Sequence, residues 1–495
     1  MAFTPTEEQA AIVEAAKRTK DNLLVSALAG ATKTSTLVLV ANAVLTPTLA
    51  LAFNKRIAEE MAKRLPGHVQ SSTINSVGHR AWGTAVGKRL AVEPNKGYND
   101  LKEYSDTKPQ SQKKLISDNF AAIMRAVRLA KSMGYVPPKA QSMGKSLCDE
   151  GSFEAALWNA VDADVDDFFL STVDEMLLRS IAQAYNGLID FDDQIYMSTL
   201  FGGQFTKFPL VLADEVQDLS PLNFETLTKV IGSRLIAVGD QNQAIYGFRG
   251  AHTSAMSVMK EKFDMTELPL TISMRCPIKV VEYVRHRVPT MRYPDWAKEG
   301  KVERLTELDP KDIVDGSAII CRNNAPLFAC AMRLIRAGRG IHLIGNDIGA
   351  GLVKLMKKIA PNTLPKEEFR KAIRAWHTEE IRRQPEERHA VIHDKFACLN
   401  VFADVGNDSN EAMLWAENLF KQAGPIQMMT GHKSKGLEFD IVYHLEPHLI
   451  PSKWSRKAAE EGDDTQLQQE YNLQYVIHTR AKETLYIIDL EDIIE

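Results

Sequence analysis

The stretch NLLVSALAGATKTSTLVLV, residues 22–40, decides the fold of this chain. The apolar run at residues 22–27 predicts a buried strand, and the run after Lys33 predicts a helix. In the turn between them, backbone N–H groups and a helix N-terminus can hold phosphate oxygens. Against the pattern G-x-x-x-x-G-K-[ST], Ala27 and Thr32 replace the glycines, whereas Lys33 and Thr34 are kept. Alone, the turn also fits a chance strand-turn-helix unit, because a β-branched Thr32 suits the backbone angles of glycine poorly.

Seven further apolar runs, each followed by a turn signal and a helical pattern, repeat this unit along the chain. They read TLALAFN, FPLVLADE, SRLIAVGD, GSAIICR, GIHLIG, FDIVYHLE and ETLYIIDL. Such alternation predicts parallel sheets in α/β domains. Two charged helical stretches, residues 80–186 and 350–422, interrupt it and are interpreted as insertions. We therefore expect a first α/β domain at residues 1–79 and 187–268, and a second at 269–349 and 423–495.

The composition is that of an ordinary globular protein with several domains. With 495 residues, 44 % hydrophobic and 25 % charged, the chain is too long for one core, and coiled-coil, collagen-like and largely disordered classes are excluded. Lysine and arginine number 60 against 64 acidic residues, and the net charge of −4 neither supports nor excludes a nucleic-acid partner. Five scattered cysteines without a C-x-x-C pair indicate reduced thiols rather than disulfides or a zinc site.

The chain shows no sign of a membrane or secretory segment. It has no run of about 18 apolar residues, and the acidic start MAFTPTEEQA is unlike a signal peptide. We therefore expect a cytoplasmic protein without a membrane partner. The absence of basic localisation runs favours a bacterial protein, or a viral one in its host's cytoplasm.

An acidic pair, Asp214-Glu215, leaves the apolar run PLVLA. A metal–phosphate site needs charge at such a strand end. Asp214 would hold Mg²⁺ directly or through water, and Glu215 would orient and deprotonate the attacking water. The alternative is a solvated strand end, where carboxylates commonly form turns.

Further motifs follow the phosphate loop in a fixed order. They are LAFNKRIAEEM, TINSVGHR, LADEVQDLS, VGDQNQAIYGFRGA, LTISMRCP, CRNNAPL, MMTGHKSKGLEFDIVY and EYNLQYVIHTRAKETLY. This series spans nearly the whole chain and resembles that of the UvrD/Rep/PcrA-type DNA helicases of superfamily 1. The resemblance implies an α/β fold of two RecA-like parallel-sheet domains (P-loop NTPase type), each with a mainly helical insertion. It also implies ATP and Mg²⁺ as cofactors.

The resemblance assigns one group of residues to the nucleotide. Gln9 would read adenine, Gln243 would sense the γ-phosphate, and Glu438 would meet the ribose, with Gly436 near the nucleotide. Arg275 and Arg480 would be two arginine fingers that stabilise the transition-state charge when the domains close. The phosphate loop, with Lys33 and Thr34 on the phosphates and Mg²⁺, comprises Ala27, Leu28, Ala29, Gly30, Ala31, Thr32, Lys33, Thr34 and Ser35.

A second group is assigned to single-stranded DNA. By the same resemblance it comprises Phe53, Asn54, Thr73, Ser76, Thr430 and His432, with Tyr246 and Phe248 stacking on bases. Without the resemblance, the two stacking aromatics would be interpreted as core residues and His432 as a structural histidine. Arg275 and Arg480 would then be surface ion-pair residues. The pair Asp192-Asp193 in IDFDDQIY matches a further family segment, with no chemistry assigned to it.

Three departures from the family pattern bear on the nucleotide, and a fourth places Phe248 where a tryptophan is common. Thr32 stands where the family has the glycine before the lysine. Ser35 and Met274 stand where family members place an arginine and a tyrosine that clamp adenine. The loss of planar stacking predicts weaker nucleotide affinity or looser base choice. The second insertion also looks shorter than in well-known members.

The sequence therefore predicts an ATP-dependent DNA helicase or translocase that moves 3′ to 5′ on single-stranded DNA, in replication, recombination or repair. Its expected partners are single-stranded DNA and duplex junctions, together with replication or recombination proteins, and we expect a monomer. The alternative is a non-hydrolysing DNA-binding or scaffold protein with a degenerate phosphate loop. A nuclease-fused helicase is disfavoured, because no long stretch follows the last motif.

Overall fold

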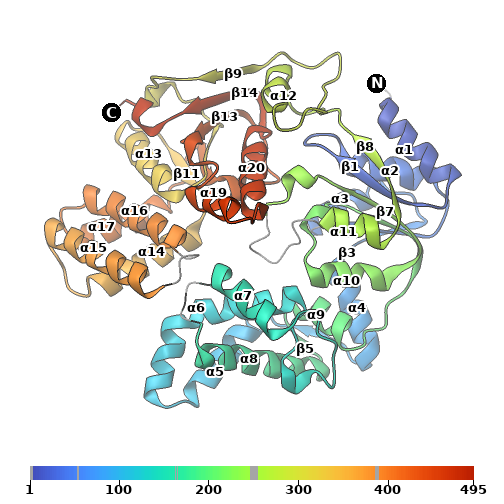
Figure 1. Cartoon of the computed structure of the whole chain (residues 1–495), viewed down its shortest axis with the longest axis horizontal. Helices are drawn as coiled ribbons and strands as arrows, with labels where there is room; N and C mark the ends of the chain where they lie inside the picture. Colours follow the sequence, from blue (N-terminus) through green and yellow to red (C-terminus); the bar gives the residue numbers. More distant parts are fainter. Residues whose placement is uncertain are drawn as a thin grey trace. The chain divides into compact units, whose positions relative to one another are not determined.

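The computed structural model describes residues 4–494 except 53–54, 162, 164, 246–254 and 385–388. The chain divides into two compact units, each containing one six-stranded parallel sheet (Figure 1). The first unit comprises Met1–Ala27 and Thr32–Leu270, and the second comprises Leu28–Ala31 and Thr271–Glu495. These two parallel-sheet units confirm the α/β fold class that the alternating sequence runs predict.

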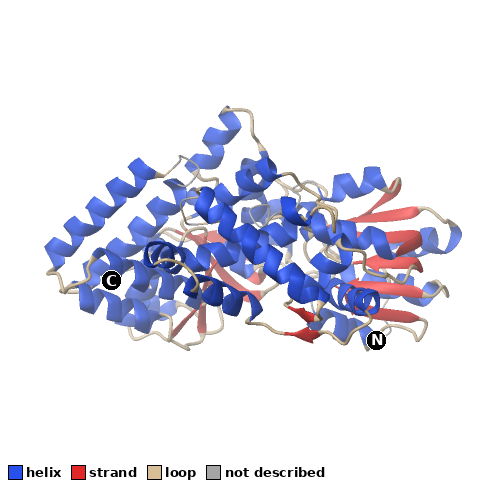
Figure 2. Cartoon of the chain, turned by 90° about the horizontal axis from the view of Figure 1, so that it is seen from below, coloured by secondary structure: helices blue, strands red, loops and turns tan. Residues whose placement is uncertain are grey.

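The sheet of the first unit has the strand order β3-β2-β6-β7-β1-β8. Its strands are β1 (Asn22–Ala27), β2 (Thr48–Ala52), β3 (Val69–Thr73), β6 (Phe208–Ala213), β7 (Ile231–Gly239) and β8 (Met265–Leu270). All five residues of β2 are buried, as expected of a strand covered on both faces of a parallel sheet. Figure 2 shows these strands side by side with helices around them. The helices next to the strands in sequence are α1 (Glu7–Arg18), α2 (Lys33–Ala43), α3 (Lys55–Ala62), α4 (Ile74–Val86), α9 (Asp193–Leu200), α10 (Pro221–Val230) and α11 (Ala255–Lys262).

The sheet of the second unit has the order β11-β12-β10-β13-β14-β9. Its strands are β9 (Lys301–Arg304), β10 (Ala318–Cys321), β11 (Ile341–Leu343), β12 (Ile426–Thr430), β13 (Phe439–Leu445) and β14 (Ala481–Ile488). Its helices are α12 (Ile278–Val284), α13 (Asn324–Arg336), α14 (Asn346–Ile359), α15 (Lys366–Arg383), α16 (His389–Val405), α17 (Ser409–Leu419), α18 (Gly431–Ser434), α19 (Lys453–Glu460) and α20 (Thr465–His478). Among the described helices of both units, none combines the length and the apolar character needed to cross a bilayer.

A helical segment of the first unit lies between two short strands that pair with each other. β4 (Ala91–Val92) and β5 (Leu188–Ile189) are parallel, and the Ala91 N–H donates to the Gly187 carbonyl at 2.8 Å. The helices between them are α5 (Lys96–Asp106), α6 (Gln110–Met133), α7 (Glu150–Ala160) and α8 (Asp167–Tyr185). They share an apolar core of their own that includes Leu101, Ile123, Phe153 and Leu177. The two ends of the segment therefore adjoin.

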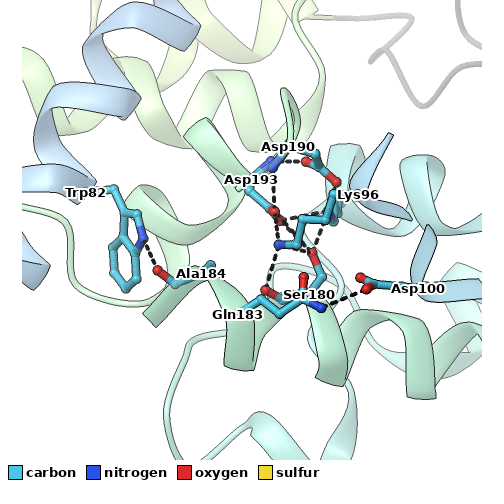
Figure 3. Close-up of polar contacts among 9 residues, drawn as sticks. Trp82, Lys96, Asp100, Ser180, Gln183, Ala184, Asp190 and Asp193 are labelled. Atoms are coloured by element: carbon cyan, nitrogen blue, oxygen red, sulfur yellow. Dashed lines mark hydrogen bonds and ion pairs between the residues drawn. The ribbon is translucent and has the colours of Figure 1, made fainter. Parts of the chain in front are cut away.

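A buried network of charges joins this segment to α9 (Figure 3). Lys96 Nζ lies 2.6 Å from Asp193 Oδ2, and Lys131 Nζ lies 2.7 Å from Asp193 Oδ1. Ser180 Oγ, on α8, donates to Asp193 Oδ1 at 2.9 Å. The Asp190 N–H donates to Asp193 Oδ2 at 2.9 Å, and Asp190 also pairs with Lys131 at 2.7 Å. The fully buried carboxylate of Asp193 thus ties α5, α6 and α8 to the start of α9.

This network predicts a specific sensitivity to acid. Burial works to raise the pKa of Asp193, but Lys131 and Lys96 outweigh it and lower the pKa to about 2. The pKa of an aspartate in the unfolded chain is about 4. The ionised Asp193 therefore contributes its full stabilisation above about pH 4, and this contribution is lost as the pH falls from about 4 to about 2. The difference in free energy of unfolding between the wild type and Asp193→Asn should therefore shrink across this window, as measured by urea unfolding. A difference that stays constant there would contradict the role given to the two lysines.

Candidate nucleotide-binding site

Three neighbouring strands of the first unit place polar residues at one edge of the sheet. β6, β7 and β1 lie side by side in this order and run parallel. They end at Ala213, Gly239 and Ala27, and Asp214, Asp240 and the phosphate loop follow them. Because the carboxyl ends of parallel strands meet at one edge, these groups converge where open α/β sheets bind ligands.

Lys33 places a largely buried ammonium, with the side chain 12 % exposed, among carboxylates. Its Nζ lies 3.2 Å from Glu215 Oε2. Burial works to lower the pKa of Lys33, but the charges of Glu215, Asp240 and Asp214 outweigh burial and raise it. The side chain therefore stays protonated, as a contact with phosphate oxygens requires.

Asp214 and Thr34 offer oxygen ligands for a divalent cation. Thr34 Oγ1 donates to Asp214 Oδ2 at 2.6 Å, and the Glu215 N–H donates to Asp214 Oδ1 at 2.9 Å. Burial and the adjacent charge of Glu215 raise the pKa of Asp214 to about 6. A cation would relieve this crowding of negative charge, and hydroxyl and carboxylate oxygens are ligands that Mg²⁺ accepts. The residues present therefore fit Mg²⁺.

Glu215 begins a chain of hydrogen bonds that crosses from β6 to β7. Gln217 Nε2 donates to Glu215 Oε2 at 2.7 Å, and Gln217 Oε1 accepts from the Asp240 N–H at 3.1 Å. Asp240 Oδ2 accepts from Gln243 Nε2 at 2.6 Å. Glu215 has a left-handed backbone with φ 54°, a conformation that costs a non-glycine residue about 1–2 kcal/mol and occurs often at functional sites. The chain connects the predicted base, Glu215, with the predicted γ-phosphate sensor, Gln243.

Thr32 also has a left-handed backbone, with φ 55° and ψ 40°. Glycine adopts this conformation without strain, which is the reason for glycine at this place in the usual pattern. Gln9 Nε2 donates to Thr32 Oγ1 at 2.9 Å and to Thr36 Oγ1 at 3.1 Å. The Thr36 hydroxyl donates in turn to the Thr32 carbonyl at 3.1 Å. Gln9, the predicted adenine reader on α1, is thus buried against Thr32 and α2.

The remainder of the phosphate loop is closely packed. Gly30 has φ 75°, where any side chain would strain the backbone. Ser35, one of the two places that lack a clamping side chain, accepts a hydrogen bond from Arg64 Nη2 at 3.1 Å. Arg64, just beyond the end of α3, therefore places its guanidinium beside Ser35, the position at which the family pattern has an arginine. The buried loop residues are Ala27, Leu28, Ala29 and Ala31.

Within the second unit, the predicted nucleotide contacts gather at the loop that carries Gly436 and Glu438. Arg275 Nε lies 2.6 Å from Glu438 Oε2, so the first predicted finger is paired with the predicted ribose contact. Arg480 is only 1 % exposed and donates to the carbonyls of Val476 at 2.9 Å and Leu437 at 3.1 Å. Gly436, with φ 84°, lies in the turn before Leu437. Arg480, the second predicted finger, is therefore held by main-chain contacts beside the loop that carries Glu438.

The described candidates for strand contact lie where parallel strands end. Thr73 ends β3, and its Oγ1 accepts from the Ser76 N–H at 3.1 Å, which caps α4. Thr430 ends β12, and His432 lies in the short helix α18 that follows. Each pair thus lies at the carboxyl edge of the sheet in its own unit. Phe53, Asn54, Tyr246 and Phe248 lie outside the described residues.

Comparison with known families decides the assignment. Residues 6–264, more than half of the chain, match the family model of the UvrD/REP helicase N-terminal domain. The chain belongs to the UvrD/Rep helicase family. Residues 374–492 match the UvrD-like helicase C-terminal domain, so both units carry a UvrD/Rep match.

Relatives of the chain include DNA helicases from fungi and bacteria. The F-box DNA helicase protein 1 of Schizosaccharomyces pombe is 24 % identical over 531 residues, covering 98 % of this chain and 57 % of the relative. DNA helicase II of Rickettsia typhi is 31 % identical over 20 % of this chain and 16 % of its own length. The mitochondrial ATP-dependent DNA helicase HMI1 of Saccharomyces cerevisiae is 35 % identical over 19 % of this chain and 13 % of its own length. The chain thus spans little more than half of the first relative and less of the other two.

Two polar residues of the candidate site, Gln217 and Asp240, have no role in the sequence-based prediction. Asp240 follows a buried apolar run in the same way as Asp214 does, so the same signal was present in the sequence. Gln217 lies two residues after Glu215 and carries no such signal. Its role becomes visible only through its contacts with Glu215 and Asp240.

Proposed function

We propose that this chain is an ATP-dependent DNA helicase or translocase that moves 3′ to 5′ along single-stranded DNA, as a monomer. The observation that carries the proposal is the assembly of Lys33, Thr34, Asp214 and Glu215 at the carboxyl edge of the first sheet. The names of the relatives, all DNA helicases, support it. The proposed insertions are residues 80–186 and 350–422, and the proposed setting is replication, recombination or repair in the cytoplasm.

The proposed chemistry is attack of water on the γ-phosphorus of ATP. Glu215 accepts a proton from the water as the new P–O bond forms, and the bond to the bridging oxygen breaks to release ADP. Lys33 balances charge on the phosphate oxygens, and Arg275 and Arg480 act as arginine fingers on the transition state. When bound by Thr34 and Asp214, Mg²⁺ would neutralise part of the phosphate charge.

Gln243 is the proposed link between the nucleotide and the DNA strand. The hydrogen-bond chain through Asp240 joins it to Glu215. In the sequence it precedes Tyr246 and Phe248, the proposed base-stacking aromatics, by only a few residues. A change in the contacts of the γ-phosphate would therefore reach the strand through a short stretch of chain.

The proposal is tested by measuring ATP hydrolysis with Mg²⁺, with and without single-stranded DNA, beside a Lys33→Ala control. Strand-dependent turnover that disappears in the control is the expected result. Strand or nucleotide binding without turnover would instead favour the non-hydrolysing binder, because a strained Thr32 and the absent clamp at Ser35 and Met274 would then have disabled the site. Metal-dependent cutting of DNA would point to a nuclease.

Binding to single-stranded DNA is expected to depend strongly on salt and weakly on sequence. Phosphate contacts release counterions, so the affinity should fall by about tenfold or more between about 50 and 200 mM salt. Stacking on aromatic side chains accepts every base, so homopolymers of different bases should bind within about tenfold of one another. Fluorescence anisotropy with labelled oligonucleotides measures both effects. Affinity unchanged by salt would contradict the proposed backbone contacts.

A further inference from the structure

We propose that the nucleotide site discriminates little between bases, because Thr32 holds the side chain of Gln9 in hydrogen bonds that leave no donor for the base. The site would then accept nucleoside triphosphates as a class, with the triphosphate rather than adenine as the recognised group. This inference rests on the proposed function and concerns the substrate of the same site.

Both the nitrogen and the oxygen of the Gln9 side-chain amide make hydrogen bonds. Its Nε2 carries two hydrogens, and these point to Thr32 Oγ1 at 2.9 Å and Thr36 Oγ1 at 3.1 Å. Its Oε1 accepts from the Thr6 N–H at 3.0 Å, as part of the cap of α1. Gln9 is 1 % exposed. An amide that reads adenine must donate and accept at the base edge, and here both donor hydrogens are already used.

The orientation of the amide follows from its partners. The main-chain N–H of Thr6 can only donate, so the Gln9 atom that faces it is the oxygen. The nitrogen must then face the two threonines. The Thr36 hydroxyl gives its own hydrogen to the Thr32 carbonyl, which leaves its lone pairs to accept from Gln9. Reversing the amide would place oxygen against oxygen at Thr36 and nitrogen against the Thr6 N–H.

Thr32 is the residue that creates this arrangement. A glycine there would have the same backbone conformation without strain and would have no hydroxyl to accept from Gln9. The other expected contacts with the base add no specificity. Ser35 and Met274 offer no planar group, and the arginine that reaches Ser35, Arg64, can stack on any base.

The test compares kcat/KM for ATP, GTP, CTP and UTP, with single-stranded DNA present. In the wild type we expect the four values to lie within about tenfold of one another, since both donor hydrogens of the Gln9 amide are used by Thr32 and Thr36. Thr32→Gly should raise the preference for ATP by about fivefold or more, because it frees one Nε2 hydrogen of Gln9. The matched control Thr32→Ser keeps the hydroxyl and should keep the wild-type ratios. Ratios within one variant do not depend on the fraction of folded protein.

Gln9→Ala supplies a second, independent readout. If Gln9 does not read the base, its removal leaves the ratio of ATP to GTP unchanged, whatever it does to stability. Displacement of a fluorescent ATP analogue by each of the four nucleotides tests the same point by binding, without turnover. A wild-type preference for ATP above about a hundredfold, or a loss of that preference in Gln9→Ala, would overturn the inference. Absence of turnover with all four nucleotides would refute the proposed function instead, and displacement would still decide the inference.

Discussion

Glu215→Gln is expected to bind ATP but to hydrolyse it at least about a hundredfold more slowly than the wild type. The amide keeps the size of the carboxylate and can still meet Gln217, but it cannot accept a proton from water. In the wild type, Lys33 Nζ lies 3.2 Å from the Glu215 carboxylate. In the variant this negative charge is removed, and Lys33 remains available to the phosphates. Steady-state hydrolysis with saturating single-stranded DNA measures the loss, and equilibrium binding of a fluorescent ATP analogue measures what is retained.

Glu225→Gln is the matched control for this substitution. Glu225 lies on α10 of the same unit and pairs with Lys229 at 3.2 Å on the helix surface, so the same chemical change occurs away from the site. Its turnover should equal that of the wild type. Near-normal hydrolysis by Glu215→Gln would remove Glu215 from the role of general base.

Asp193→Asn is expected to lower the free energy of unfolding of the first unit by about 3–5 kcal/mol. In the wild type, Lys96 and Lys131 both contact the Asp193 carboxylate within 2.7 Å. The substitution leaves the buried Lys96 ammonium beside a neutral amide and leaves Lys131 with Asp190 as its one remaining carboxylate in this network. The cost arises from uncompensated buried charge rather than from a lost cavity contact, because asparagine fills nearly the same volume. The loss of stability is measured by urea unfolding, as a lower midpoint concentration with an unchanged dependence of the free energy of unfolding on urea concentration.

The same Glu225→Gln variant shows what a surface pair contributes. It should change the free energy of unfolding by less than about 1 kcal/mol, because partly exposed i, i+4 pairs on a helix contribute little. If Asp193→Asn and Glu225→Gln lower the free energy of unfolding by equally small amounts, then the buried network does not hold the helical segment to α9.

The local parts of the site could be predicted from the sequence, because each is a short motif at a strand end. Lys33 and Thr34 begin α2 after the short loop that follows β1, and Asp214 and Glu215 follow β6 directly. Their convergence with Asp240 depends on strand order, in which β7 lies between β6 and β1. Strand order is set by packing across the sheet and cannot be read from the residues of a single strand.

The long-range polar contacts could not be predicted for a related reason. Asp193 belongs to an acidic pair that stands out in the sequence, but its partners Lys131 and Lys96 lie 62 and 97 residues away, in a stretch that the sequence marks only as a charged helical insertion. Motif position alone assigns Gln9 to adenine. Only the three-dimensional arrangement shows that the Gln9 amide donates a hydrogen bond to Thr32, the residue that replaces glycine in the family pattern.

The pairing of β4 with β5 bears on how such a chain is assembled over evolution. Since the two strands are hydrogen-bonded neighbours, the polypeptide leaves the α/β core and returns to it at points about 5 Å apart. An insertion with adjoining ends can be acquired, enlarged or exchanged without rethreading the sheet. The connectivity of α5 to α8 would therefore permit this segment to be exchanged while the strands around the candidate nucleotide site keep their order.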